Sequence, residues 1–158
     1  RFVIGQPLPY RIARGLALAL LLVVTAALIG SLVLLVINLP HFDNQAAILL
    51  RAAAALWSIN VLTFGLWFWE VDGDGPLRRL ESPAKPVDFL FPQHTRPDSQ
   101  DWKPGFVDYV FVAFCFATAL SPADTAPLSR RCKLLMMAEA VISLLIVVLL
   151  IGRSVNII

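Results

Sequence analysis

The chain has 158 residues, of which 58% are hydrophobic and only 15% are charged. Soluble domains have about 45–50% apolar and about 25% charged residues, so this composition excludes an ordinary water-soluble domain and indicates a membrane protein. The 13 basic and 11 acidic residues leave a net charge of +2, which excludes a nucleic-acid protein that relies on a large basic surface. Cys115 and Cys132 are too few for a disulfide framework and lack the spacing of metal ligands.

The first apolar segment, residues 15–39, predicts a membrane-spanning helix. It has 25 consecutive residues without a charge, and a span needs roughly 20 apolar residues. The apolar part of a signal peptide is shorter, about 7–15 residues. Pro40 ends the segment. We expect residues 1–45 to form an extra N-terminal transmembrane helix ahead of a second unit, residues 46–158.

The second apolar segment predicts another span, over residues 46–69. Its last residues are rich in tryptophan and phenylalanine, as at Trp67 and Trp69, and such aromatic residues mark the membrane–water interface. Asn60 lies near the middle of this segment. Because an amide in lipid needs a hydrogen-bonding partner, we expect Asn60 to face another helix.

Residues 70–105 predict an aqueous loop, since they carry 12 of the 24 charges and six of the 11 prolines. Four acids near the start of the loop have the spacing of a calcium-binding loop. They are Glu70, Asp72, Asp74 and Glu81, with Gly75 at the turn position. The first position is Glu rather than Asp, and Pro76 follows the glycine. The segment is therefore either a calcium site or an acidic turn that follows a membrane helix.

The third apolar segment, residues 106–120, is too short to span a membrane. It has 15 residues, including Asp108, which suits a re-entrant or buried helix. The last apolar segment lies within residues 130–156 and predicts a third span. The expected fold is an all-α membrane protein with three transmembrane helices, a re-entrant pore helix and a pore loop.

The loop at residues 118–125 is polar and built from small residues, as a pore loop requires. One chain supplies one such loop, so a pore needs several chains around a closed symmetry axis. The residues Thr118, Ala119, Leu120, Ser121, Pro122, Ala123 and Asp124 stand where the potassium-channel filter reads T-T-V-G-Y-G-D. Residues 138–143, AEAVIS, are similar to the inner-helix stretch L-E-A-L-I-G of bacterial two-span channels, with Ser143 at the glycine hinge.

From residue 52 onward, the chain therefore resembles the pore module of tetrameric cation channels of the potassium-channel type. The resemblance implies a homotetramer with an outer helix at 46–69, a pore helix at 106–120, a filter-like loop at 118–125 and an inner helix at 130–156. A potassium filter uses backbone dihedrals that glycine supplies easily. This loop has no glycine, and Pro122 restricts it further.

We accordingly predict a channel for monovalent cations with weak or non-potassium selectivity, in which these cations are the expected ligands of the pore. The alternative is a non-conducting, channel-like membrane scaffold or accessory subunit. Asp124 is either part of an acidic ring that attracts cations or a loop acid that bonds backbone amides. No pattern typical of a catalytic site occurs in the sequence, so we do not expect an enzyme.

Two residues of the last span, Glu139 and Ser143, are candidates for the inner-helix part of the pathway. An acid within a span is costly and is a functional-site hypothesis by default. Glu139 is either a charged or proton-linked group behind the filter or half of a structural pair. Its candidate partners in such a pair are a polar group of the pore helix and Arg131.

Two indications of the membrane orientation conflict with each other. Three spans put the N-terminus and residues 71–133 on one side, together with eleven of the 13 basic residues. The positive-inside rule places that side in the cytoplasm, whereas the channel resemblance places the filter loop outside. We follow the resemblance and expect an integral protein of a prokaryotic plasma membrane, with the lipid bilayer and copies of itself as partners.

Overall fold

The computed structural model describes residues 9–38, 46–81, 87–97, 102–118 and 124–155. Within these ranges, three helices are long and apolar enough to cross a membrane, which confirms an all-α membrane protein. They are α1 (Tyr10–Asn38), α2 (Ala46–Val71) and α5 (Arg130–Val155). Helix α1 begins five residues before the predicted apolar segment because Arg11 and Arg14 continue the helix into the interface, where long basic side chains are stable.

Shorter elements lie between the spans. Between α2 and α5 the chain forms η2 (Asp72–Asp74), α3 (Pro76–Glu81), β1 (Phe89–Leu90), η3 (Pro92–Thr95), α4 (Phe106–Ala117) and β2 (Ala126–Pro127). Strands β1 and β2 pair antiparallel, with Phe89 opposite Pro127 and Leu90 opposite Ala126. The predicted polar loop thus contains short ordered pieces, and its strand is fixed to the residues just before α5.

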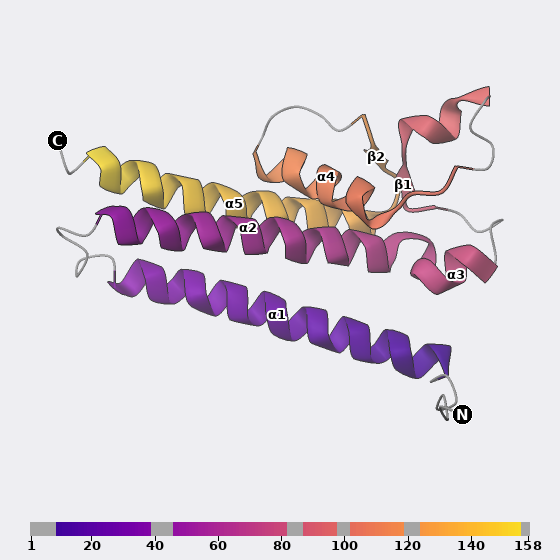
Figure 1. The fold of residues 1–158 in the computed structure, drawn as a ribbon, viewed down its shortest axis with the longest axis horizontal. Helices are drawn as coiled ribbons and strands as arrows, with labels where there is room; N and C mark the ends of the chain where they lie inside the picture. The colour runs from indigo at the N-terminus through magenta and orange to yellow at the C-terminus, as the bar shows by residue number, and fades with distance from the viewer. Residues whose placement is uncertain (1–8, 39–45, 82–86, 98–101, 119–123, 156–158) are drawn as a thin grey trace, which may run out of the picture.

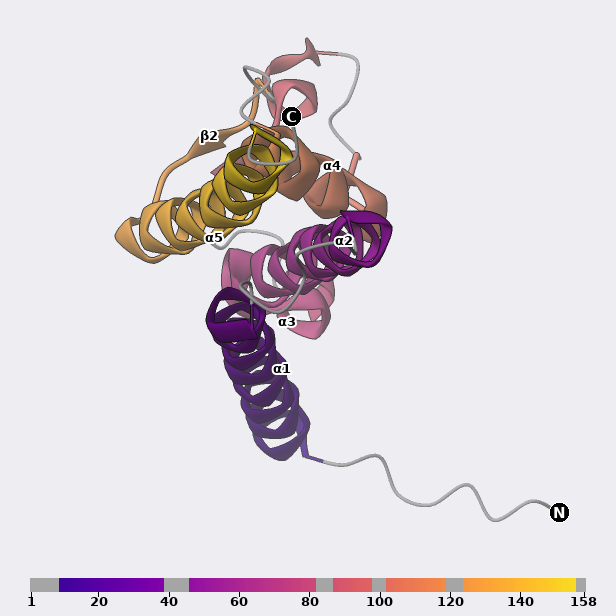
Figure 2. The ribbon, with the colours of Figure 1, turned by 90° about the vertical axis from the view of Figure 1, so that its left-hand side faces the viewer.

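Helix α2 is the central element, with α1 on one side and α4 and α5 on the other (Figures 1 and 2). Helix α1 buries only four leucines and leaves most of its other apolar residues exposed, as expected of a helix that faces lipid. Near its middle, Trp67 of α2 donates a hydrogen bond from Nε1 to Thr25 Oγ1 of α1 at 2.9 Å. The hydrophobic core therefore lies mainly between α2, α4 and α5.

Helix α4 runs antiparallel to α2 and covers about half of its length (Figure 1). At its start, the Phe106 ring lies 5.0 Å from the Trp69 ring. At its end, Trp57 Nε1 lies 3.5 Å from the Ala117 carbonyl oxygen. Trp57 and Trp69 are 12 residues apart on α2, or about 18 Å along the helix axis. Strand β2 is paired with β1 near the start of α4. The chain therefore runs along α4 to the middle of α2, and by β2 it is again near the start of α4.

A glycine allows the close contact between α2 and α4. A Cβ added at Gly65 would lie 3.0 Å from Val110 Cγ2 and 3.1 Å from Val110 Cα. Any larger residue at this position would push the two helices apart. Helix α4 ends at Ala117, three residues before the predicted end of the pore helix.

Candidate functional site

The C-terminal end of α2 is a sharp turn. Gly73, Asp74 and Gly75 all have positive φ angles, of 55°, 65° and 102°. A Cβ added at Gly73 would lie 2.9 Å from Arg79 Cγ, so both the backbone conformation and the space favour glycine there. The turn ends the helix and directs Asp72 and Asp74 toward different neighbours.

Asp72 is fully buried, and its carboxylate has three donors. The backbone amides of Asp88 and Phe89 donate to Oδ1 at 2.6 and 3.2 Å. The Tyr109 hydroxyl of α4 donates to Oδ2 at 2.5 Å. Asp72 therefore joins the end of α2 to both β1 and α4, and both of its side-chain oxygens have protein donors.

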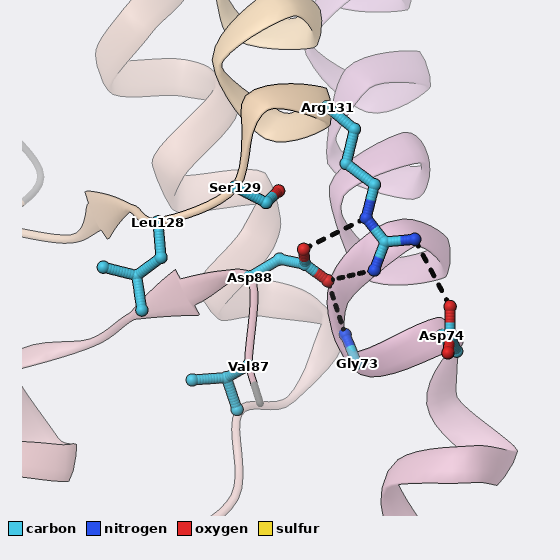
Figure 3. Close-up of a pocket in the computed structure, with 7 residues that line it drawn as sticks. All are labelled: Gly73, Asp74, Val87, Asp88, Leu128, Ser129 and Arg131. Carbon is cyan, nitrogen blue, oxygen red and sulfur yellow. Dashed lines mark hydrogen bonds and ion pairs between the residues drawn. The ribbon is translucent and has the colours of Figure 1, made fainter. Parts of the chain in front are cut away.

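Asp88 is also buried and binds Arg131, the second residue of α5 (Figure 3). The guanidinium makes two contacts, Nε to Oδ1 at 3.0 Å and Nη2 to Oδ2 at 2.6 Å. The Gly73 amide donates to Oδ2 at 3.0 Å. Burial by itself would raise the pKa of Asp88, but the hydrogen bonds from Arg131, Ser129 and the Gly73 amide hold it below its ordinary value.

Asp74 extends these contacts to α1. Arg131 Nη1 and Arg14 Nη2 lie 3.3 and 3.2 Å from Asp74 Oδ1, and the Tyr10 hydroxyl donates to the Asp74 carbonyl oxygen. We call the connected set the surface network. It consists of Arg14, Asp72, Asp74, Asp88, Tyr109 and Arg131. It ties α1, α2, α4 and α5 together at one end of the bundle.

An open cavity of about 490 Å³ lies beside the surface network (Figure 3). It is lined by Gly73, Asp74, Val87, Asp88, Leu128, Ser129 and Arg131. The charged groups in it bind each other, with Arg131 shared between Asp74 and Asp88. Asp74 also binds Arg14, which is outside the lining, so the two acids are matched by two arginines and the cavity offers little net attraction for an anion or a cation.

The predicted calcium acids are separated by these contacts. Asp72 accepts hydrogen bonds from protein donors, and Asp74 binds two arginines. The side chain of Glu81 lies outside the described part of the chain. In the described ranges, no group of three or more His, Cys, Asp or Glu residues is placed to hold a metal ion. A calcium site with Glu70, Asp72, Asp74 and Glu81 stays a prediction without structural support.

Most of the predicted pore loop, residues 119–123, lies outside the described residues. These are Ala119, Leu120, Ser121, Pro122 and Ala123. Thr118 lies at the inner end of α4, where its hydroxyl donates to the Phe114 carbonyl oxygen at 2.8 Å. Asp124 is exposed and lies two residues before β2. The two described ends of the loop are thus at opposite ends of α4.

A second group of polar residues lies in the apolar part of the bundle. Asn60 of α2 is fully buried, and its Nδ2 lies 3.3 Å from Ser143 Oγ and 3.5 Å from the Glu139 carbonyl oxygen. The prediction that Asn60 faces another helix is confirmed, and that helix is α5. We call Asn60, Glu139 and Ser143 the core polar group. Glu139 and Ser143 are buried against α2 within a single chain.

Glu139 has no structural partner of the expected kind. Its side chain is fully buried, and neither carboxyl oxygen makes a hydrogen bond with any described residue. The same holds for Asn60 Oδ1. The expectation that Arg131 could pair with Glu139 is wrong, because Arg131 binds Asp88 and Asp74. Arg131 is eight residues, about 12 Å, before Glu139 on α5, and near the interface its charge is paired at lower cost.

Sequence reasoning missed the central acid of the surface network, Asp88, and the structural role of Tyr109. Their partners are 15 to 43 residues away in the chain, so local spacing carries no signal for them.

Comparison with known proteins does not identify the site. No family model, no curated protein and no solved structure matches the chain.

Proposed function

We propose that this chain is one subunit of a homotetrameric pore-loop channel that passes monovalent cations with weak or non-potassium selectivity. The observation that carries the proposal is the course of α4. This apolar helix of 12 residues packs between two spans, ends at mid-helix depth near Trp57, and is followed by a chain that is back at the starting end by β2. Irregular backbone at such depth is stable only when protein buries it or when it lines a water-filled path.

The direction of α4 suits cations. Its C-terminal end, at Ala117 and Thr118, is the end that lies deep in the bundle. The C-terminus of a helix carries a partial negative charge, and half-helices in transporters use this end for cation sites. In this proposal, the pathway passes the loop from Thr118 to Asp124 on the symmetry axis. Each chain contributes one loop, so four copies surround the pore.

The surface network supports this arrangement because it fixes both sides of the loop. Tyr109 on α4 and Asp88 next to β1 are joined to the end of α2. Arg131 joins the start of α5 to the same acids. A loop between α4 and β2 is therefore carried by a rigid frame, as a functional loop requires. With the loop facing outward, as in the channels that this chain resembles, the network lies at the outer surface of a prokaryotic plasma membrane.

The test is cation flux in proteoliposomes containing the purified protein, with potassium and sodium measured separately. We expect flux of both ions from a tetramer, and a lower flux from the Asp124→Asn variant because it removes a negative charge at the mouth. Asp124→Glu keeps the charge and is the matched control, with flux close to that of the wild type. Absence of flux from correctly assembled tetramers over a range of voltage and pH would refute the proposal.

One observation favours the alternative, a non-conducting scaffold or accessory subunit. Glu139 and Ser143 of α5 are buried against α2 within one chain, so they are turned away from any central cavity. A channel's inner helix usually presents its polar residues to the ion path. Stable oligomers without flux would support the scaffold, and the same liposome experiment therefore separates the two functions.

A further inference from the structure

The core polar group contains an acid in a region without other charges. Three apolar stretches of the spans, residues 15–38, 52–69 and 134–149, contain a single ionisable side chain, Glu139. That side chain is fully buried, and its two oxygens have no hydrogen-bond donor among the described residues. A bare carboxylate here would be an isolated charge in an apolar medium, which is the most costly state that a side chain can take.

The titratable groups on the neighbouring helices do not compensate such a charge. On α4, the Tyr109 hydroxyl donates a hydrogen bond to Asp72, the Asp108 side chain accepts one from the Gly105 amide, and Cys115 is half-buried. On α5, the buried Cys132 lies two helical turns before Glu139. The facing stretches of α1 and α2 hold no titratable residue at all.

We propose that Glu139 is a proton-binding site in the core of the bundle, with Asn60 Oδ1 as the acceptor for the bound proton. A proton removes the charge and turns the carboxyl group into an O–H donor. Asn60 lies at the same contact between α2 and α5, with Nδ2 3.5 Å from the Glu139 carbonyl oxygen, and its Oδ1 is the acceptor that has no partner among the described residues. One proton therefore satisfies both groups.

The site is distinct from the pore loop, because it lies between two helices of a single chain and does not depend on conduction. The proton leaves only when water or another base reaches the contact between α2 and α5, since the described residues at this contact include no base. Protonation of Glu139 thus favours the packed state of these two helices, and opening of their contact favours proton release.

The first test uses dicyclohexylcarbodiimide, an apolar reagent that reacts with neutral carboxyl groups. The carboxyl O–H adds across one C=N bond, so that the proton goes to nitrogen and the oxygen bonds to the central carbon. Transfer of the acyl group to nitrogen then gives a stable N-acylurea, without any other reactant. In micelles at neutral pH, we expect the peptide that contains Glu139 to gain the mass of one reagent molecule. When the reaction is carried out at alkaline pH, we expect no labelling of this peptide.

Two variants control this experiment. Glu139→Gln should lose the label completely, and Asp124→Asn, which changes an exposed acid, should keep it. A water-soluble carbodiimide should show the opposite preference and spare Glu139. If Glu139→Gln is labelled as strongly as the wild type, the proposal is overturned.

The second test keeps the proposal falsifiable if the reagent does not reach the site. Infrared difference spectra between neutral and alkaline pH should contain the carbonyl band of a protonated carboxyl group, which is absent in Glu139→Gln and present in Asp124→Asn. Asn60→Leu should shift this band to higher frequency because the hydrogen bond is lost. No such band in the wild type would refute the proton site, and an unshifted band in Asn60→Leu would refute the role of Asn60. If Glu139 binds a proton but the protein shows no cation flux, the channel proposal is refuted and the proton site is not.

Discussion

The buried acids of the surface network and of the core polar group differ in their hydrogen-bond donors. Asp72 is fully buried and has three donors, of which two are backbone amides. Glu139 is equally buried and has none among the described residues. The difference follows from the backbone around each acid. Phe89 begins the short strand β1 and Asp88 directly precedes it, and both direct their N–H groups at Asp72, whereas helices in the apolar region use their N–H groups internally.

The comparison teaches where a charge is stable in this fold. At the end of the bundle, irregular backbone and arginines supply hydrogen-bond donors to the acids, and these contacts hold the elements together. Between α2 and α5, only side chains can supply donors, and the available amide group of Asn60 is already used by Ser143 and a carbonyl. An acid in the first place contributes stability as an anion, and an acid in the second place is stable as a neutral group.

The largest expected effect is that of Asp72→Ala, which removes the acceptor for three donors. We expect the free energy of unfolding to fall by about 3–5 kcal/mol, as for the loss of one partner from a buried charged network. Equilibrium unfolding in mixed detergent micelles measures this change. Asp124→Ala, at an exposed acid, is the control and should have little effect. A loss below about 1 kcal/mol for Asp72→Ala would mean that the network does not stabilise the bundle.

A smaller effect is expected from Arg131→Lys. The lysine keeps the charge but cannot make both contacts with Asp88, so we expect a loss of about 1–2 kcal/mol in the free energy of unfolding. The matched control is Arg130→Lys, because Arg130 is the exposed neighbour of Arg131 on the same helix. Equal effects of the two substitutions would show that only charge matters at this position, and not the two-point geometry.

The pH dependence of stability tests the charge of Asp88. Its pKa is lowered in the folded protein, so the anion is favoured by folding. The resulting stability is fully present above the pKa of the unfolded chain, about 3.9, and is lost as the pH falls through the lower folded pKa. We expect the unfolding temperature of the wild type to fall steeply in this acidic range. Asp88→Asn should have a lower unfolding temperature at neutral pH and a shallower acid slope, and an unchanged slope would contradict this account.

The smallest effect, and the one that most sharply contrasts the two regions, is expected from Glu139→Gln. If the acid is neutral, the amide replaces it at similar size and no charge pairing is lost. We expect the free energy of unfolding at neutral pH to change by less than about 1 kcal/mol. A loss as large as that of Asp72→Ala would show that Glu139 is an ionised, paired group, and the contrast between the two regions would be wrong.

Much of the fold could be predicted from the sequence because hydrophobic length is a local property. Helix α2 begins at the predicted residue 46 and ends at Val71, two residues beyond the predicted boundary. The short length of the third apolar segment likewise predicted a helix that does not span, and α4 is one. That Arg131 does not pair with Glu139 was not predictable in the same way, because the acids that Arg131 binds, Asp74 and Asp88, are 57 and 43 residues away in the chain.

The sequence by itself determined the three spans, the short apolar helix and the polar segment between them, since each follows from how many consecutive residues avoid charge. It also placed Asn60 against another helix. The tertiary structure decided which polar groups meet. Asp72, Asp88, Tyr109 and Arg131 come together only when β1 returns to the end of α2, and Glu139 is left without them. Such pairings depend on contacts distant in the chain, whereas the spans depend only on their own residues.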